Sequence, residues 1–460
     1  MSKYSSTVMV PLRRRIFLDP ALIVFGIILF ISVLRIAYAG FVMDPHSGQD
    51  APSYFVDAKL VLRYGFFSPL AYAPYWPVGY TWFISIIWGI FGVDSRALGV
   101  IQGLLLTVAI WSLFKLVQRE LDRNVALLAS LLVSISPALF VSSAEIMYEV
   151  PMLSFLLIGA NLLSFSTISK KRIRISLFCG AFFLAIAVLI HPSAGAPSLG
   201  LLLIVIWRLY KSQMVSGAIL GLAFSIFLSG PALNILDNNV AYKGVGYTTT
   251  ALSNMQLGGW NSVPGVDQSQ CLALAKKAQR SPGRDVEGKK VEKNLQWDSA
   301  LPAACLILTT LKNPIYFMKA LNFNASRWIS PYTGILKGHG TWYHGLDWRR
   351  LLPWYTWWTG SWRIFDYYLC YLWIAMHVGL ASRGIYLLLQ SCRKRKLRYS
   401  SLLFFSVPVA ASFLLSAFTC GDTRHRLLIS PFYITLISAA LLGIASSIRT
   451  RFKLKSNLSK

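Results

Sequence analysis

The stretch IFLDPALIVFGIILFISVLRIAYA, residues 16–39, decides the class of this chain. A helix needs about 20 mainly apolar residues to cross a hydrocarbon core of about 30 Å, and this run is long enough. Comparable runs recur along most of the sequence, in which 55% of the 460 residues are hydrophobic and only 14% are charged. A soluble core does not need so many apolar segments, so the composition predicts a polytopic membrane protein.

Ten membrane-spanning helices are predicted, and the fold class is therefore all-α. Short loops rich in Lys and Arg stay on the cytoplasmic side of a membrane. With the arginines of the N-terminal tail inside, alternation places every later basic cluster on that same side. Both termini are then expected in the cytoplasm, with the chain in a bacterial plasma membrane. The predicted spans are residues 16–39, 97–117, 125–141, 150–168, 173–191, 193–210, 214–232, 367–390, 401–418 and 427–446.

Two shorter apolar stretches, residues 79–93 and 300–311, are not predicted to cross the membrane. If either did, later Lys and Arg clusters would lie on the wrong side. We therefore expect helices that lie in or near the outer interface.

The loops divide the chain into three parts. Residues 1–232 form an N-terminal membrane module with a first outer loop at 40–96, and residues 367–460 form C-terminal spans with a basic tail. Between them, residues 233–366 have a polar middle and are expected to fold as a small outer cap with short helices. Cys271 and Cys305 lie in this loop, and both a disulfide and two free thiols stay open.

The net charge of +27, from 45 Lys and Arg against 18 Asp and Glu, does not indicate a nucleic-acid partner. In the predicted topology much of the basic excess is cytoplasmic, where it orients the chain and attracts anionic lipid. Most carboxylates face outward, so acid–base chemistry is expected on the outer face. No Asp/His cluster or cysteine spacing demands a metal, and no cofactor is indicated, although a divalent metal stays open.

Four groups of polar residues meet on that outer face in the predicted topology. Asp50 follows the first span in SGQDAPSYFVDAKLVLRYG (47–65) and precedes a Pro-rich aromatic run. Glu145 and Glu149 are four residues apart, so they share one face of a helix. Tyr54 and Tyr80 follow Asp50, His191 stands at the outer end of the fifth span, and Arg424, His425 and Arg426 precede the last span.

Each group also has a plain structural interpretation. Asp50 would then be a solvated loop carboxylate, and the two glutamates would cap the outer start of a helix, where the dipole favours negative charge. His191 would be a hydrogen-bonded helix terminator. Arg424 and Arg426 would be interfacial side chains that reach toward water.

The chain resembles the GT-C superfamily of membrane glycosyltransferases, the group of protein O-mannosyltransferases and the lipid A aminoarabinose transferase. In that superfamily an Asp after the first span opens a pattern with Tyr, Ala and Gly, followed by Pro and Tyr. An Arg opens the second span, a carboxylate precedes the fourth, and R-Y-R-x-P-x-x-P stands near the C-terminus. The matching positions here are Asp50, Tyr54, Ala58, Gly65, Pro77, Tyr80, Arg96, Glu145 or Glu149, Pro151, Arg424, Arg426 and Pro431, with His425, Leu428 and His191 as departures.

The resemblance implies transfer of a sugar from a polyprenyl-phosphate carrier to a lipid, glycan or protein acceptor on the extracytoplasmic face, usually with inversion. Asp50 would be the general base that accepts the acceptor's hydroxyl proton. Tyr54, Tyr80, His191 and one of the two glutamates would position sugar or acceptor. Arg96, Arg424, His425 and Arg426 would bind the lipid phosphate, since arginine holds phosphate oxygens with two donors.

Three other functions stay open. A polysaccharide polymerase or ligase acting on polyprenyl-diphosphate-linked glycans would also use outer arginines, but would not require Asp50. A secondary transporter would show paired midplane charges or repeated halves, which the sequence lacks. A non-catalytic assembly partner would keep the fold without activity. The sequence does not reveal sugar, acceptor or oligomeric state.

Overall fold

A computed structural model describes most of the chain, namely residues 20–42, 51–68, 77–167, 172–242, 279–284, 290–295, 308–329, 363–394, 397–418 and 423–458. The elements in chain order are α1 (Pro20–Val42), α2 (Ala51–Tyr64), α3 (Val78–Phe91), α4 (Ser95–Glu120), α5 (Arg123–Ser134), α6 (Pro137–Ser142), α7 (Glu149–Ser166), α8 (Ile173–Ile190), the 3₁₀ turn η1 (Pro192–Ala194), α9 (Gly195–Lys211), α10 (Gly217–Tyr242), β1 (Gln279–Arg284), β2 (Lys290–Leu295), α14 (Pro314–Ile329), α16 (Arg363–Arg393), α17 (Tyr399–Phe418) and α18 (Thr423–Leu458).

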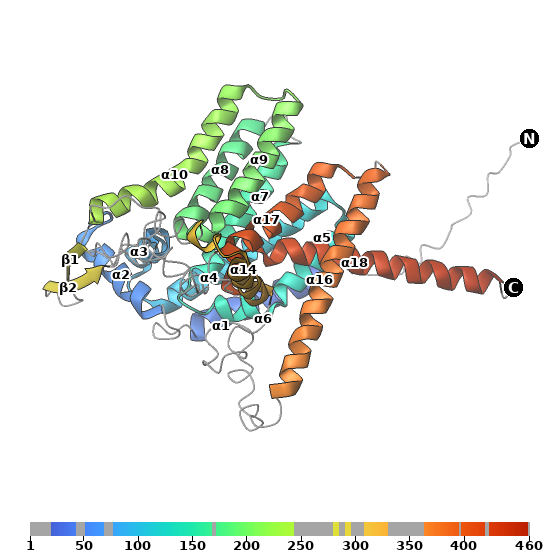
Figure 1. Cartoon of the computed structure of the whole chain (residues 1–460), viewed down its shortest axis with the longest axis horizontal. Helices are drawn as coiled ribbons and strands as arrows, with labels where there is room; N and C mark the ends of the chain where they lie inside the picture. The colour runs from blue at the N-terminus through green and yellow to red at the C-terminus, as the bar shows by residue number, and fades with distance from the viewer. Residues whose placement is uncertain are drawn as a thin grey trace, which may run out of the picture.

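Helices dominate the described part of the chain, and seven of them are long and apolar enough to cross a membrane (Figure 1). They are α1, α4, α7, α8, η1 with α9, α10 and α18, and each corresponds to a predicted span. The predicted spans at 367–390 and 401–418 are also helical, in α16 and α17, but stand outside this group. The prediction of an all-α, multi-pass membrane protein is confirmed.

The predicted span at 125–141 differs from the structure, because two helices replace one. Helix α5 ends at Ser134, and α6 begins at Pro137. Proline has no backbone N–H to donate and disfavours helical geometry in the residue before it, so a helix commonly stops there and restarts. The break shortens α5 and turns the chain toward the segment that carries Glu145.

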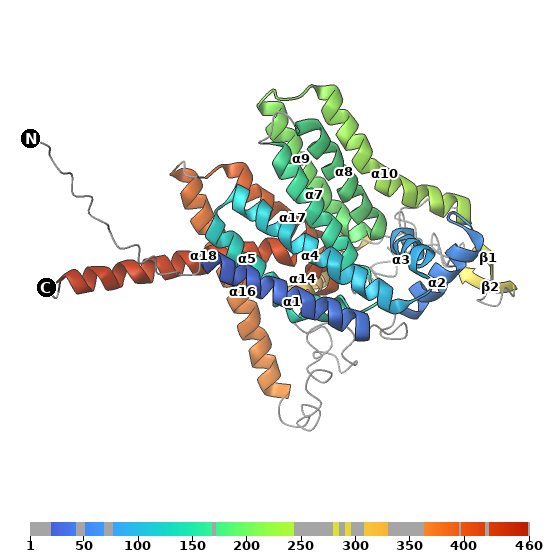
Figure 2. The same cartoon turned by 180° about the vertical axis from the view of Figure 1, so that it is seen from behind.

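The membrane helices form one packed bundle. Helix α7 packs against α4 and α8, α10 packs against α8, and α16, α17 and α18 pack together beside them. Figure 2 shows α1 lying along α4 on the back of the bundle. Buried Leu, Ile, Val, Ala and Phe side chains from these helices form the main core.

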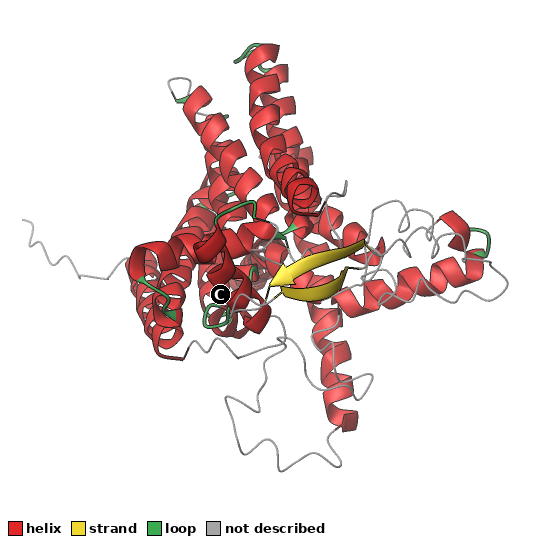
Figure 3. Cartoon of the chain, turned by 90° about the vertical axis from the view of Figure 1, so that its left-hand side faces the viewer, coloured by secondary structure: helices red, strands yellow, loops and turns green. Residues whose placement is uncertain are grey.

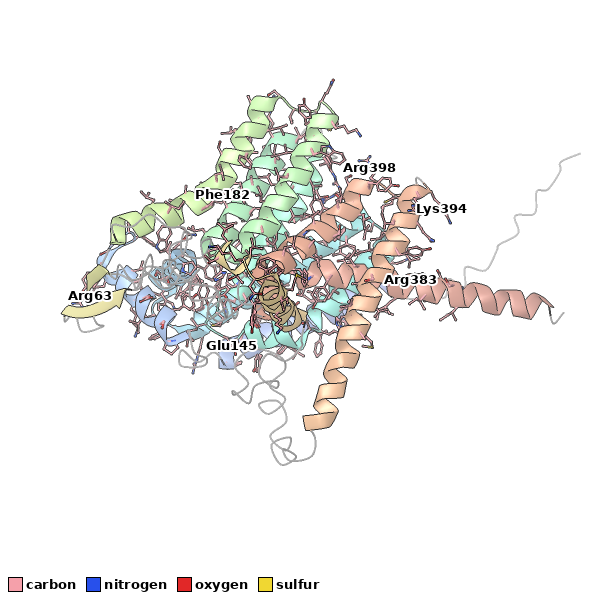
Figure 4. All side chains as sticks on the ribbon, in the orientation of Figure 1. Arg63, Glu145, Phe182, Arg383, Lys394 and Arg398 are labelled. Carbon is pink, nitrogen blue, oxygen red and sulfur yellow. The ribbon has the colours of Figure 1, made fainter. Side chains whose placement is uncertain are left out.

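The two ends of the bundle carry charged residues of different kinds. Figure 4 labels Glu145 at one end and Lys394 and Arg398 at the opposite end of the view. We call these the site end and the basic end. They correspond to the sides that the sequence predicts to be extracytoplasmic and cytoplasmic.

The predicted first outer loop contains two helices, α2 and α3, which pack against each other at the site end. The Ser85 hydroxyl on α3 donates a 3.1 Å hydrogen bond to the Ala58 carbonyl on α2. Helix α3 also approaches α8 closely, since a Cβ placed on Gly79 would lie only 2.3 Å from the Leu189 carbonyl oxygen. Glycine is therefore required there, and it brings Tyr80 beside the end of α8.

The loop predicted as a cap contains a strand pair as well as a helix. Strands β1 and β2 form an antiparallel hairpin in which Gln279 pairs with Leu295 and Arg284 with Lys290 (Figure 3). Helix α14 follows, and α10 continues past residue 232 to Tyr242. Short helices alone were expected here. Cys271, Cys305 and most of the 300–311 stretch lie outside the described residues.

Candidate functional site

Aromatic side chains from three segments meet at the site end. Tyr54 on α2 and Tyr80 on α3 are fully buried, and their ring centroids lie 4.8 Å apart in an edge-to-face arrangement. Tyr148, directly before α7, lies 6.4 Å from Tyr54. Edge-to-face pairs at these distances are favourable because a ring edge is positive and a ring face negative.

Both glutamates lie in this cluster. Glu145 belongs to the non-helical segment 143–148 between α6 and α7, and Glu149 is the first residue of α7. Only 7% of Glu145 and 2% of Glu149 are exposed. Burial, followed by the charges of Glu149 and Glu145, raises the pKa of Tyr80 well above its ordinary value. The Tyr80 phenol therefore keeps its proton and acts as a hydrogen-bond donor.

His191 joins the cluster from the end of α8. Its ring stacks on Tyr148 with 4.0 Å between centroids and 3° between planes. Its Nδ1 lies 2.8 Å from the Ser193 hydroxyl and accepts the Ser193 backbone N–H at 3.2 Å. His191 thus ends α8 and caps η1, as the plain interpretation expects, while its ring also forms part of the site.

Gln102 on α4 is hydrogen-bonded to this cluster, and it was not identified from the sequence. It is fully buried, accepts a 3.0 Å hydrogen bond from the Tyr80 hydroxyl, and donates to the carbonyls of Ser143 at 3.2 Å and Glu145 at 3.0 Å. The available signal was an amide inside an apolar span, since such a group needs partners there.

Other predicted site residues are not placed in the cluster. Asp50 lies outside the described residues, and α2 begins directly after it, at Ala51. Helix α18 begins at Thr423, so Arg424 and Arg426 belong to its first turn, but their side chains are outside the description, as is that of His425. Arg96 is exposed in the first turn of α4, where its backbone N–H donates to the capping carboxylate of Asp94 at 2.8 Å.

The described part of the chain contains no group of three or more His, Cys, Asp or Glu side chains that could hold a metal ion. What it does bring together is two buried carboxylates, phenols and an imidazole. Such a site can orient hydroxyl groups through hydrogen bonds and provide aromatic faces to a sugar ring.

Comparison with known proteins identifies the fold in which this site lies. Residues 76–233 match the family model described as dolichyl-phosphate-mannose-protein mannosyltransferase. The stretch contains Tyr80, Gln102, both glutamates and His191. The apo oligosaccharyltransferase of Archaeoglobus fulgidus superposes with a TM-score of 0.50 at 13% identity, over 95% of this chain and 52% of that one. The chain has the GT-C fold.

The GT-C fold that the sequence resemblance implies is thereby confirmed. A second GT-C structure, ArnT from Cupriavidus metallidurans bound to undecaprenyl phosphate, matches at 12% identity with a TM-score of 0.39, over 93% of this chain and 78% of that one. The chain spans about half the length of the archaeal oligosaccharyltransferase. No curated protein sequence matches it.

Proposed function

We propose that the protein is an inverting membrane glycosyltransferase. It takes a sugar from a polyprenyl-phosphate carrier and transfers it to an acceptor on the extracytoplasmic face of a bacterial plasma membrane. The observation that carries the proposal is the cluster at the site end in which the half-buried His191 joins four buried residues, Tyr54, Tyr80, Glu145 and Glu149. It is built from helix ends of the GT-C fold, mostly inside the stretch that matches the mannosyltransferase model.

The choice of carrier has two supports. The oligosaccharyltransferase of Archaeoglobus fulgidus has also been solved with a dolichol-phosphate and an inhibitory peptide. The predicted topology supplies the second, since nucleotide sugars stay in the cytoplasm and a site on the outer face needs a donor that the membrane delivers. A prenyl tail would lie between helices and leave its phosphate at the interface.

Asp50 is the general base in this proposal. The acceptor hydroxyl oxygen forms a bond to the anomeric carbon while the bond from that carbon to the carrier phosphate oxygen breaks. The hydroxyl proton passes to the Asp50 carboxylate, and the polyprenyl phosphate leaves as an anion. A leaving group that is already stable as an anion needs no strong general acid.

Cations stabilise the charge that grows on the leaving phosphate. Arg424 and Arg426 are the proposed clamp, with His425 and Arg96 beside them, because the guanidinium group can donate two parallel hydrogen bonds to phosphate oxygens. The buried glutamates and tyrosines hold sugar and acceptor hydroxyls. Holding reactants in a reactive geometry lowers the barrier by reducing the entropy lost in reaching the transition state.

Replacement of the base tests the proposal. We expect Asp50→Asn to insert and fold normally but to lose at least about a hundredfold of transfer rate, because removing a general base typically costs 10²–10⁴-fold. The measurement is transfer of labelled sugar in membranes supplied with polyprenyl monophosphate sugars, and separately with diphosphate-linked glycans. Full activity in Asp50→Asn, or activity with the diphosphate carrier alone, would contradict it.

Asp94→Asn is the matched control. Asp94 stands in the same predicted outer loop, and its side chain caps α4 by accepting the Arg96 N–H. Asparagine caps helices about as well as aspartate. This variant should keep both fold and activity.

A further inference from the structure

Gln102 makes hydrogen bonds with three different segments of the site end. Its Oε1 accepts from Tyr80 on α3, and its Nε2 uses both protons, one for the Ser143 carbonyl and one for the Glu145 carbonyl. None of the side chain is exposed. An amide has this donor and acceptor capacity, and here the described contacts use its oxygen and both of its N–H groups.

The segment that Gln102 holds has little helical structure of its own. Residues 143–148 lie between α6 and α7. Backbone bonds tie the ends of this segment to the two helices, from Ser143 N–H to Leu139 at 3.2 Å and from Met152 N–H to Tyr148 at 3.0 Å. Within it, Glu145 N–H donates to Ser142 at 3.4 Å and Met147 N–H to Glu145 at 2.8 Å. A buried carbonyl outside a helix needs a hydrogen-bond donor, and a carbonyl oxygen can accept more than one. Gln102 supplies donors at both Ser143 and Glu145, which anchors the residue whose carboxylate enters the cluster.

We infer that Gln102 is a positioning residue for glycosyl transfer, because it holds the 143–145 backbone against α3 and thereby fixes where the Glu145 carboxylate lies. The inference rests on the proposed function. The described contacts of Gln102 are with Tyr80 and with the Ser143 and Glu145 backbone, so it acts through these groups and is not itself catalytic.

The direction of each bond explains why glutamine is needed. A leucine of similar size would remove the donors to both buried carbonyls, and that of Glu145 would keep its bond from the Met147 N–H. A glutamate could still accept from Tyr80, but it would face the carbonyls of Ser143 and Glu145 with negative oxygen instead of N–H. The Tyr80 phenol stays protonated beside the two glutamates, so it remains the donor of this pair.

Hydrogen exchange tests the positioning directly. In Gln102→Leu and Gln102→Glu we expect the backbone amides of 143–148 to exchange at least about tenfold faster, because their segment has lost its anchor. Thr107→Val is the control, since Thr107 lies on the same helix and its hydroxyl accepts from Arg35 at 3.3 Å, outside the cluster. It should leave exchange at 143–148 unchanged. Unchanged exchange in Gln102→Leu would overturn the inference.

Transfer kinetics test the consequence for the reaction. Gln102→Leu should lower kcat by roughly tenfold or more, since small displacements of positioning groups have effects of this order, while the KM for the carrier stays within about twofold. Equal kcat in Gln102→Leu and Thr107→Val would overturn the inference that this anchoring matters for glycosyl transfer. A wild type without transfer activity would overturn the proposed function instead, and the exchange rates would still decide whether Gln102 anchors the segment.

Discussion

His191 has two roles that single substitutions can separate. Its Nδ1 caps η1 by accepting the Ser193 N–H, and its ring stacks on Tyr148 within the cluster. The first role concerns stability, because loss of a helix cap typically costs about 1 kcal/mol. The second concerns the shape and polarity of the site.

We expect His191→Asn to retain most of the stability, because an asparagine side-chain oxygen can accept the same N–H, and His191→Ala to lose about 1 kcal/mol. Both should lose transfer activity if the stacked ring is part of the site. Thermal unfolding in detergent measures the stability, and the transfer assay measures the activity. Full activity in His191→Asn would mean that the residue is a helix terminator only.

Sequence reasoning found Glu145, Glu149, Tyr54, Tyr80 and His191, which come from distant segments and which the structure brings together. Topology and the GT-C resemblance carried that prediction together, because alternation places their helix ends on one side of the membrane and the family pattern singles these positions out. Gln102 could not be found the same way. Its role depends on which backbone carbonyls lie opposite its amide, and those belong to a non-helical segment that no periodicity describes.

At the scale of elements, a buried ion pair joins four helices at the basic end. Glu120 on α4 accepts two hydrogen bonds from Arg208 on α9, at 2.7 and 2.9 Å. The Glu120 carboxylate also accepts from Ser164 on α7 and, at 2.7 Å, from Ser401 on α17. Within the described residues, this one carboxylate therefore connects helices that are far apart in the sequence.

Removing one partner should destabilise the bundle more than removing both. Glu120→Leu leaves the Arg208 charge buried, a change that typically costs about 3–5 kcal/mol, whereas Glu120→Leu with Arg208→Leu removes both charges and should recover much of that loss. Thermal unfolding of the two variants beside the wild type measures the difference. If the double variant is as unstable as the single one, the loss of stability does not come from an unpaired buried charge.

Hydropathy predicted where the long membrane helices lie, because the bilayer thickness fixes their minimum length. It did not predict how they end. Pro137 splits the predicted 125–141 span into α5 and α6, and the close approach at Gly79 sets the position of α3. Both depend on backbone geometry at single residues, which a sum of hydrophobicity over a window does not contain. The β1–β2 hairpin lies in a polar stretch, where apolar alternation gives no signal.

At the scale of the whole molecule, the site end and the basic end should lie on opposite sides of the membrane. Val93, between α3 and α4, is 50% exposed at the site end. Gln213, between α9 and α10, is exposed at the basic end. The predicted topology places the first position outside and the second in the cytoplasm.

Cysteine labelling in intact cells measures this orientation. A membrane-impermeant maleimide should react with Val93→Cys and not with Gln213→Cys, beyond the labelling of the parent chain, which already contains six cysteines. Permeabilised cells, in which both should react, provide the control. Labelling of Gln213→Cys alone in intact cells would reverse the topology and move the proposed chemistry to the cytoplasm.

Helix α4 is fixed near both extremities, by Gln102 toward the site end and by Glu120 at the basic end. Eighteen positions separate these residues, which corresponds to about 27 Å of helix at 1.5 Å per residue. A helix that is hydrogen-bonded to its neighbours near both of its ends resists both tilting and sliding. If the proposed polyprenyl carrier binds between the helices, we therefore expect neighbouring helices to move to admit it while α4 stays in place.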